Sequence, residues 1–278
     1  MAGMCGRYAA SRNPDDLVEE FEVDAPPPEE SLQPDYNVAP TKKVYAVLTR
    51  ADEQGTPRRR LAVVRWGLVP SWAKDPSIGS RMINARMETV ADKPAYKRAF
   101  ARRRALLPAD GYYEWYTPEG PDAPKGKGGK PLKQPFFIHP RDGGVLAMAA
   151  IYEIWHDKTR ADDDPAAWLW TASVLTTEAE DAVGRIHDRM PLMVERDRWS
   201  AWLDPGLDDP DAARALLVPA APGRLEAYPV STAVNRVQHN GPALVEPLPL
   251  EEALPGTLDE AAASLVTGDQ PTLFGAQE

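Results

Sequence analysis

The order of strand-like and helix-like segments constrains the fold of this 278-residue chain most strongly. Runs rich in β-branched and aromatic residues, which are typical of strands, cover residues 43–50, 61–66, 105–116, 135–140, 145–155, 167–176 and 225–230. No regular helical pattern separates these runs, whereas a doubly wound parallel sheet needs a crossover helix after each strand. The sequence therefore predicts an α+β domain with a curved, mainly antiparallel, barrel-like sheet.

Short helices are expected to flank this sheet. The clearest one follows Asn13, which can cap a helix that has Pro14 at its first position and an acidic first turn. Weaker helical patterns cover residues 93–104, 177–183, 196–203 and 209–217. We expect one domain over residues 4–250 and a loose C-terminal tail over residues 251–278, where apolar periodicity is lost.

The composition excludes several classes of protein. Cys5 is the only cysteine, so the chain has neither a disulfide framework nor a cysteine-rich zinc site, and no histidine or carboxylate cluster has metal-ligand spacing. No apolar run approaches the ~18 residues that a membrane-spanning helix needs. The N-terminus lacks the apolar segment of a secretory signal. We expect a cytoplasmic monomer without a membrane partner, a metal or another cofactor.

The net charge of −10 conceals an uneven distribution. Residues 36–135 carry 20 lysines and arginines against 9 acids, which leaves 12 basic and 33 acidic residues for the rest of the chain. This asymmetry favours a face that binds a polyanion, although charges that merely cover helices and loops would give the same count. In this region Trp72 is close to Lys74, and aromatic residues beside cations hold single-stranded nucleic acid. A core position for Trp72 is the alternative.

Cys5 directly follows a second methionine, Met4. If translation starts at Met4, removal of the methionine leaves Cys5 with a free α-amine beside its thiol. Unperturbed, these groups titrate near ~8 and ~8.5, so both react near neutral pH. Such a residue can condense with an aldehyde to an imine and then a thiazolidine, or it can be the nucleophile of a hydrolase. The alternatives are an inert cysteine and a chain that starts at Met1, in which the amine is blocked.

Three further positions could take part in chemistry. Asn84 and Arg86 share one face of an extended segment, where the amide can bind a carbonyl or hydroxyl and the guanidinium a phosphate. Glu114 lies among aromatic residues, which would raise its pKa and suit it to proton transfer, unless it points to solvent. His187 can exchange protons near neutral pH, although a lone histidine is more often structural.

Nine short motifs follow one another along the chain: MCGRYA, YNVAPT, WGLVPSWAKD, INARMET, DGYYEW, PFFIH, MAAIYE, IHDRMP and PVSTAVN. Together they resemble the SOS-response-associated peptidase (SRAP) family over residues 4–247. The resemblance implies an α+β fold with a basic groove for single-stranded DNA. It also implies an N-terminal cysteine that reacts with the aldehyde of an abasic site after loss of the initiator methionine. The family pattern begins at Met-Cys, whereas three residues precede it here.

The resemblance implies a role for each catalytic residue. Cys5 matches the crosslinking cysteine, and Asn84 matches the asparagine that orients the cysteine and the sugar. Glu114 matches the glutamate that acts as a general acid and base near the α-amine. His187 matches the histidine that assists opening of the sugar ring.

The resemblance also implies DNA contacts. Arg7 and Arg86 match phosphate-binding arginines, and Pro40 and Trp72 match a wall that stacks on a base. The full set of expected DNA-binding residues is Arg7, Asn37, Pro40, Trp72, Lys74, Arg81, Arg86 and Arg189.

The activity implied by the resemblance is abasic-site processing in the DNA-damage (SOS) response. A thiazolidine crosslink to single-stranded DNA, or to DNA at a single-strand/double-strand junction, shields the lesion, and the bound protein is then associated with the nucleoid. Lyase and autopeptidase activities are related expectations for the same cysteine. Two other hypotheses stay open: a thiol peptidase or hydrolase that uses Cys5, and a non-covalent reader of modified single-stranded DNA.

Overall fold

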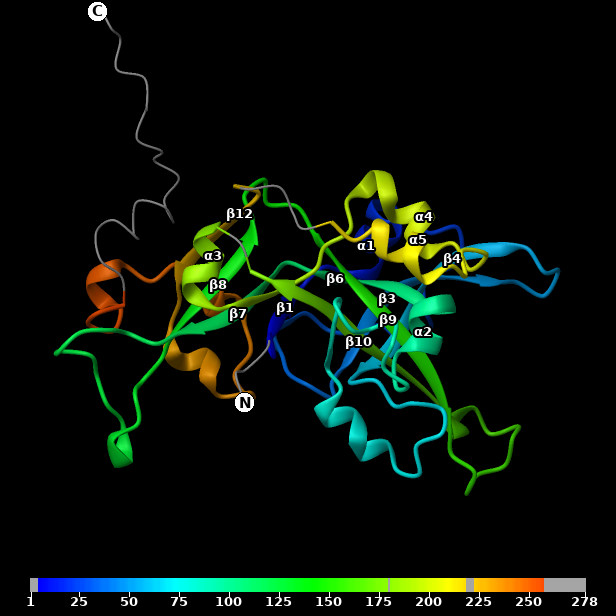
Figure 1. Ribbon diagram of the computed structural model, residues 1–278, viewed down its shortest axis with the longest axis horizontal. Helices are drawn as coiled ribbons and strands as arrows, with labels where there is room; N and C mark the ends of the chain where they lie inside the picture. Colours follow the sequence, from blue (N-terminus) through cyan, green and yellow to red (C-terminus); the bar gives the residue numbers. More distant parts are fainter. Residues whose placement is uncertain (1–4, 180, 219–222, 258–278) are drawn as a thin grey trace, which may run out of the picture.

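A closed five-stranded barrel forms the centre of the computed structural model, which describes residues 5–179, 181–218 and 223–257 (Figure 1). The barrel strands are β3 (Lys43–Ala51), β4 (Pro57–Trp66), β6 (Arg104–Ala109), β9 (Leu146–His156) and β10 (Trp168–Glu178). Each strand pairs with two others, in the order β4–β3–β6–β9–β10, and β10 closes the ring by pairing with β4. The predicted α+β class with a barrel-like, mainly antiparallel sheet is confirmed.

Two parallel pairings along β10 are exceptions to the antiparallel order. β4 meets β10 only at Thr171 and Ala172. Beyond that point the short strand β5 (Asn84–Arg86) runs parallel to β10 from Val174 to Thr176. The short strand β11 (Arg189–Pro191) pairs antiparallel with the end of β10. The last part of β10 therefore holds two chain segments that contain predicted site residues.

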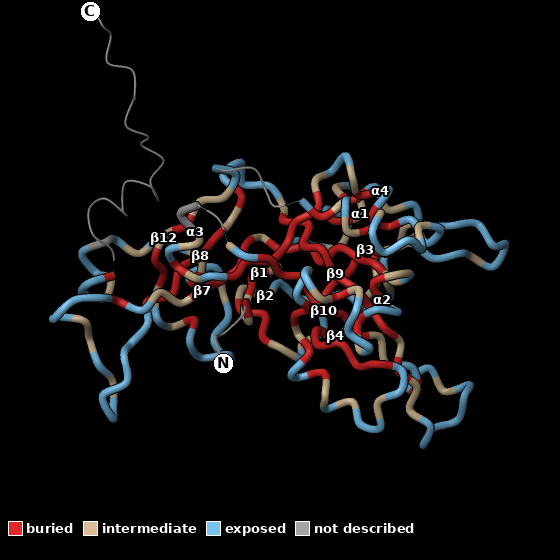
Figure 2. Tube along the Cα trace, in the orientation of Figure 1, coloured by how far each residue is buried: buried red, intermediate tan, exposed pale blue. Residues whose placement is uncertain are grey.

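A second sheet, with strand order β12–β8–β7–β1–β2, adjoins the barrel. Its strands are β1 (Tyr8–Ala10), β2 (Asp35–Val38), β7 (Gly111–Tyr116), β8 (Gln134–Pro140) and β12 (Leu225–Pro229). β1 lies between β7 and β2, so the chain just after Cys5 is hydrogen-bonded along both edges. Buried residues run continuously from this sheet into the barrel (Figure 2). One apolar cluster, with Tyr8, Tyr112 and Trp66 among its members, joins the two sheets.

The helices are short and lie at the periphery of the sheets (Figure 1). They are α1 (Pro14–Glu20), α2 (Lys97–Arg102), α3 (Asp181–Ile186), α4 (Trp199–Leu203) and α5 (Pro210–Ala215). α1 begins where the sequence predicts, because the Asn13 side chain accepts a hydrogen bond from the backbone N–H of Asp16. After α1, the ring of Phe21 stacks on Trp199 of α4 with centroids 4.6 Å apart, which fixes both helices over the barrel.

Several predicted boundaries differ from the structure. β4 begins at Pro57 because the three arginines 58–60 pair with β3 across the hairpin. The helix predicted over residues 93–104 is limited to α2, since β6 starts directly after it. At the C-terminal end, the Glu119 N–H donates to the Gly256 carbonyl at 3.0 Å, so the start of the predicted tail packs on the domain. The rest of that tail, residues 258–278, lies outside the described residues.

Candidate functional site

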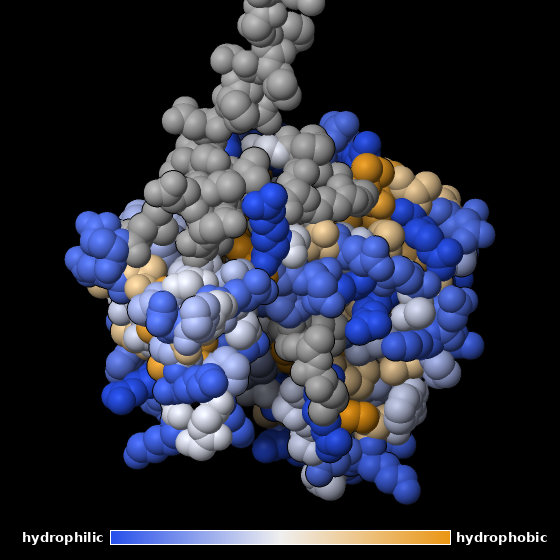
Figure 3. Space-filling view, turned by 60° about the vertical axis from the view of Figure 1, so that its left-hand side comes forward, coloured by the Kyte–Doolittle hydropathy of each residue, from blue (hydrophilic) through white to orange (hydrophobic). Residues whose placement is uncertain are grey.

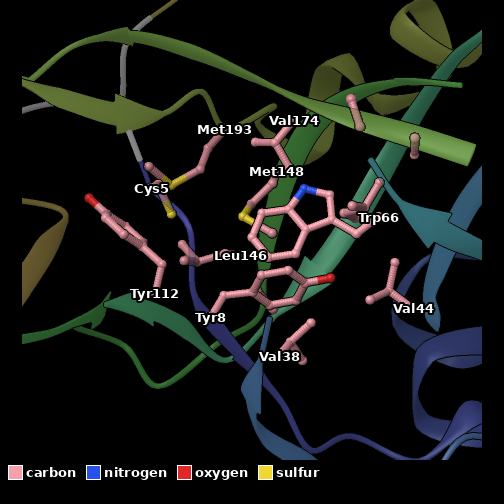
Figure 4. Packing of buried hydrophobic residues seen from close by; sticks show 14 of the residues in the cluster. Cys5, Tyr8, Val38, Val44, Trp66, Tyr112, Leu146, Met148, Val174 and Met193 are labelled. Atoms are coloured by element: carbon pink, nitrogen blue, oxygen red, sulfur yellow. The ribbon is translucent and has the colours of Figure 1, made fainter. Parts of the chain in front are cut away.

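Cys5 lies three positions before β1, and its side chain is buried in the core that the two sheets share (Figure 4). Tyr112 and Met193 lie beside it. The thiol contacts the carbonyl oxygen of Arg7 at 3.8 Å. Burial raises the pKa of the Cys5 thiol well above its usual value, and the charge of Glu114 raises it further. The sulfur is therefore held as a neutral thiol at neutral pH.

Asn84 binds the backbone of Cys5. Its Nδ2 donates to the Cys5 carbonyl oxygen at 2.7 Å, across 79 positions of sequence. The backbone of Asn84 is fixed by pairing with Val174 of β10 and by Tyr96, whose hydroxyl donates to the Asn84 carbonyl at 3.2 Å. Because one support is a strand pairing and the other is the residue that precedes α2, the amide is held in place against the backbone of Cys5.

Glu114 extends from β7 into the same interior, and it is 3% exposed. The alternative that it points to solvent is therefore wrong. Burial raises the pKa of Glu114 to about 9; Lys133 opposes this shift and Asp188 adds to it. At neutral pH the carboxyl group carries its proton, and it can donate that proton to a reacting oxygen.

Several buried polar atoms around Cys5 have no hydrogen-bond partner among the described residues. Among them are Asn84 Oδ1, Glu114 Oε1 and the Tyr112 hydroxyl. Tyr112 lies beside Cys5 (Figure 4), and the charges of Cys5 and Glu114 both raise the pKa of the Tyr112 hydroxyl. The charge of Glu114 also raises the pKa of the Cys5 thiol, so the three groups are close together. Native proteins leave few buried polar groups unpaired, so this arrangement fits a ligand that brings several hydroxyl or carbonyl groups.

The sequence analysis does not single out Tyr112. The signal that could have found it is its position two residues before Glu114, because alternate residues of a strand share one face. Its burial with an unpartnered hydroxyl cannot be read from the sequence.

His187 lies between α3 and β11 with its side chain 14% exposed. Its Nδ1 accepts a hydrogen bond from the backbone N–H of Arg189 at 3.0 Å. α3 contacts β7, and Asp188 acts on the pKa of Glu114, so the structure brings the His187 segment to the Glu114 side of the site.

Four of the predicted DNA-binding residues are exposed: Trp72, Lys74, Arg81 and Arg86. Trp72 is 63% exposed, so the alternative that it belongs to the core is wrong. Pro40 is half-buried at the turn between β2 and β3. These residues have the exposure that nucleic-acid contacts need.

The loop over residues 67–82, which carries Trp72, is fixed at two points. Gly67 and Gly79 approach so closely that a Cβ atom on Gly67 would lie 2.4 Å from the Gly79 carbonyl oxygen. Farther along, the indole N–H of Trp155 donates to the Ala73 carbonyl at 2.7 Å. The exposed loop thus has a defined position on the barrel.

Comparisons with known proteins identify the family of the chain. The model of the SOS response associated peptidase (SRAP) family matches residues 4–237. The chain belongs to the SRAP family. The match begins one residue before Cys5 and includes every predicted site residue.

Curated relatives of this SRAP chain share a name. YoqW of Bacillus subtilis is 36% identical over 243 residues, which cover 87% of this chain and 99% of YoqW. YedK of Escherichia coli is 33% identical over 250 residues, which cover 88% of this chain and 100% of YedK. HMCES of Gallus gallus is 31% identical and is covered over 71% of its length, against 84% of this chain. All three are named abasic site processing proteins.

A solved structure supports the fold. A protein from Bacteroides thetaiotaomicron superposes with a TM-score of 0.71 over 88% of this chain and 100% of its own, at 23% identity. At that identity the likeness extends to the SRAP fold alone.

Asn37 differs from the expected DNA contact. It is fully buried, and its Nδ2 donates to the carbonyl oxygens of Val234, Arg236 and His239. Its Oδ1 accepts from Arg7 at 2.7 Å, and Arg7 also donates to the Val234 carbonyl at 2.9 Å. Asn37 therefore braces Arg7 and the segment after β12, and it has no surface to offer DNA.

Arg189 is also used inside this SRAP domain. Its side chain is 9% exposed and forms a two-pronged ion pair with Glu88, at 2.7 and 3.1 Å. One of its nitrogens also donates to the Thr176 carbonyl at 2.7 Å. Instead of the expected DNA contact, Arg189 forms a clamp that ties β11 to the segment after β5.

Two kinds of site are not found in the described part of the chain. No group of three or more histidine, cysteine or acidic side chains is placed to hold a metal ion there. No helix in those residues is both long and apolar enough to cross a bilayer.

Proposed function

We propose that this protein processes abasic sites by forming a covalent thiazolidine between Cys5 and the ring-opened deoxyribose of single-stranded DNA. The observation that carries the proposal is the set of groups around Cys5: the Asn84 amide on its carbonyl, and the protonated Glu114 carboxyl beside it. The name shared by the relatives supports the lesion as substrate. Met4 would be the initiator, and its removal would free the α-amine of Cys5.

The proposed reaction has two bond-forming steps. The α-amine of Cys5 adds to C1′ of the open aldehyde, and the resulting carbinolamine loses water to give an imine. The thiol then adds across the C=N bond: sulfur bonds to C1′ and the thiol proton moves to nitrogen. One water leaves overall, and no oxidant or cofactor is consumed. Because both nucleophiles belong to one fixed residue, proximity lowers the barrier by several kcal/mol, up to ~7–11.

The neighbouring groups would act on protons and on orientation. Glu114, protonated at neutral pH, would donate a proton to the departing hydroxyl of the carbinolamine. His187, which is held by the backbone N–H of Arg189, would assist opening of the furanose ring by proton transfer. Asn84 would hold Cys5 and offer its unpaired Oδ1 to a sugar hydroxyl.

The exposed residues would hold the strand that leads to the site. Arg86 follows Asn84 in β5 by two positions and would bind a phosphate near the lesion. Trp72 would stack on a base, with Lys74 and Arg81 as further phosphate contacts. The net charge of residues 36–135 supports a polyanion partner, since phosphate contacts dominate such affinities.

The thiol peptidase alternative has less support. A hydrolytic cysteine needs a base that takes up its proton, and no base is hydrogen-bonded to the Cys5 sulfur among the described residues. The thiol of Cys5 donates its hydrogen bond to the carbonyl oxygen of Arg7, and a carbonyl oxygen cannot serve as a base.

A denaturing gel tests the proposal. The protein, produced from Met4 and verified by intact mass to begin at Cys5, is incubated with single-stranded DNA that carries one abasic site. We expect a shifted band that survives heating in detergent. Cys5→Ser keeps the amine, so it should give a band only after borohydride reduction of the imine. Binding without a band for the wild-type chain would select the non-covalent reader, and cleavage of peptides without DNA would select the peptidase.

A further inference from the structure

A second candidate site, which combines arginines with aromatic rings, lies on the barrel at the start of β10. It is a surface pocket of about 480 Å³, next to the loop that carries Trp72. Three arginines and three aromatic rings dominate the lining, which contains no acidic side chain: Arg50, Ser71, Arg98, Arg103, Ile154, His156, Trp168 and Trp170. Its volume is in the range of small-molecule sites, and its composition is that of nucleotide recognition.

The arginines of the pocket are crowded. Burial lowers the pKa of Arg103, and the charges of Arg98 and Arg50 lower it further. Arg103 forms an ion pair with Glu153, whereas Arg98 is exposed and has no ion pair among the described residues. An anion between these guanidinium groups would relieve their repulsion, and phosphate matches their geometry.

The aromatic residues provide a stacking surface. Trp168 is 44% exposed, and one face of its indole stacks on His156 with ring centroids 4.3 Å apart. Trp170 contacts both the ring of Tyr152, at 5.8 Å, and the guanidinium of Arg50, at 4.9 Å. Trp168 thus has exposed indole surface on which a base can stack, whereas Trp170 is fixed by its two neighbours.

The pocket is connected to the Cys5 site through β10. The chain after β4 follows this strand, because Gly67 N–H donates to the Ala172 carbonyl and Val69 N–H to the Thr171 hydroxyl. It reaches the pocket at Ser71, directly before Trp72. Val174 of β10 pairs with Asn84. Trp168 lies six positions earlier on the same strand, which is ~20 Å along an extended chain.

We propose that this pocket binds one nucleotide of the lesion-carrying strand, with its phosphate among the arginines and its base on Trp168. The assignment rests on the proposed function, because the strand reaches the pocket from the Cys5 site past Trp72. At the ~3.4 Å spacing of stacked nucleotides, ~20 Å corresponds to about six nucleotides, or fewer if the strand is extended. Beyond Trp168, Asp162 contacts His156 at 3.2 Å, so a further phosphate is disfavoured there.

Affinity for DNA of two lengths tests the proposal. The wild-type chain is titrated with single-stranded DNA containing a tetrahydrofuran analogue of the abasic site, which has no aldehyde and leaves binding reversible. Arg98→Ala and Trp168→Ala should each raise the Kd about tenfold for a strand of about 20 nucleotides. The Kd for a strand of about five nucleotides centred on the analogue should stay unchanged, because it cannot reach the pocket.

Arg102→Ala is the matched control, because Arg102 lies on the same helix, is exposed, and pairs with Asp208 outside the pocket. A 2-aminopurine scan locates the nucleotide: its fluorescence should be quenched at one position of the long strand, and Trp168→Ala should abolish that quenching. Wild-type affinity of Arg98→Ala and Trp168→Ala for the long strand would overturn the pocket assignment. The proposed function is judged separately, by crosslinking of the short strand with an authentic abasic site.

Discussion

Glu114 shows how a single residue can be placed for function at a cost in stability. It is a carboxyl group in an apolar interior, with one oxygen unpaired among the described residues. Its pKa is raised from 4.5 to about 9, so between these values the folded chain holds a proton that the unfolded chain has released. The free energy of unfolding therefore falls as pH rises through this window, by up to ~1.4 kcal/mol per pH unit.

Glu114→Gln should make the protein more stable and less active. The amide has the same shape and no proton to lose, so the free energy of unfolding at pH 8 should rise by about 2 kcal/mol. Its dependence on pH between 6 and 9 should also flatten. Crosslinking should slow by a factor of ~100 or more, because the proton donor is lost. Urea unfolding at several pH values and single-turnover gels measure the two effects.

Glu119→Gln is the control for this prediction. Glu119 follows β7 and its side chain is exposed, so the same substitution should change neither the pH dependence of stability nor the crosslinking rate. If Glu114→Gln instead destabilised the protein at pH 8, the carboxyl group would be a charged structural partner, and its role as a proton donor would be refuted.

At the scale of elements, the loop after β4 depends on a backbone contact. Gly67 has a φ of 124°, a region that favours glycine, and a Cβ there would meet the Gly79 carbonyl. Gly67→Ala should therefore lower the free energy of unfolding by about 3 kcal/mol. It should also weaken DNA binding, because the loop that carries Trp72 would shift. Thermal unfolding and fluorescence anisotropy test both effects.

Gly55→Ala separates strain from displacement. Gly55 also has a positive φ, of 82°, but a Cβ there would meet nothing within 4 Å. This substitution in the β3–β4 hairpin should cost about 1 kcal/mol and leave DNA affinity unchanged. Unchanged DNA affinity in Gly67→Ala would mean that the position of the loop does not matter for binding.

Elements that depend on local chemistry could be predicted from the sequence, and those that depend on distant partners could not. The start of α1 follows from Asn13 and Pro14, which act within one turn. The burial of Arg189 depends on Glu88, 101 positions away, and the burial of Asn37 on Val234, 197 positions away. A polar residue in a short motif looks the same whether it contacts a ligand or braces the fold.

The proposed catalytic residues illustrate the same limit. The aromatic neighbours of Glu114 left its burial open, and the unpaired oxygens of the site arise only when β1, β5 and β7 are brought together. The resemblance to the SRAP family pointed to Cys5 and Asn84 as site residues. The hydrogen bond between them, across 79 positions of sequence, could be found only from the structure.

The whole molecule is acidic, yet its proposed partner is a polyanion. Hydrophilic residues dominate the face seen in Figure 3, so surface polarity alone does not mark a DNA-binding region. The relevant feature is the segregation of charge: 20 of the 32 basic residues lie between residues 36 and 135. This segment supplies Trp72, Lys74, Arg81 and Arg86, all exposed.

The dependence of DNA affinity on salt tests this arrangement. Each phosphate contact contributes about 0.9 to the slope of log K against log salt for duplex DNA and ~0.7 for single strands. Arg86→Ala should therefore reduce the slope by about 0.7 and weaken binding to all sequences equally, without change in the melting temperature. Arg196→Ala is the matched control, because Arg196 is exposed but paired with Glu20 and Glu22 near α1. An equal loss of slope in both variants would mean that net charge, rather than a placed contact, governs binding.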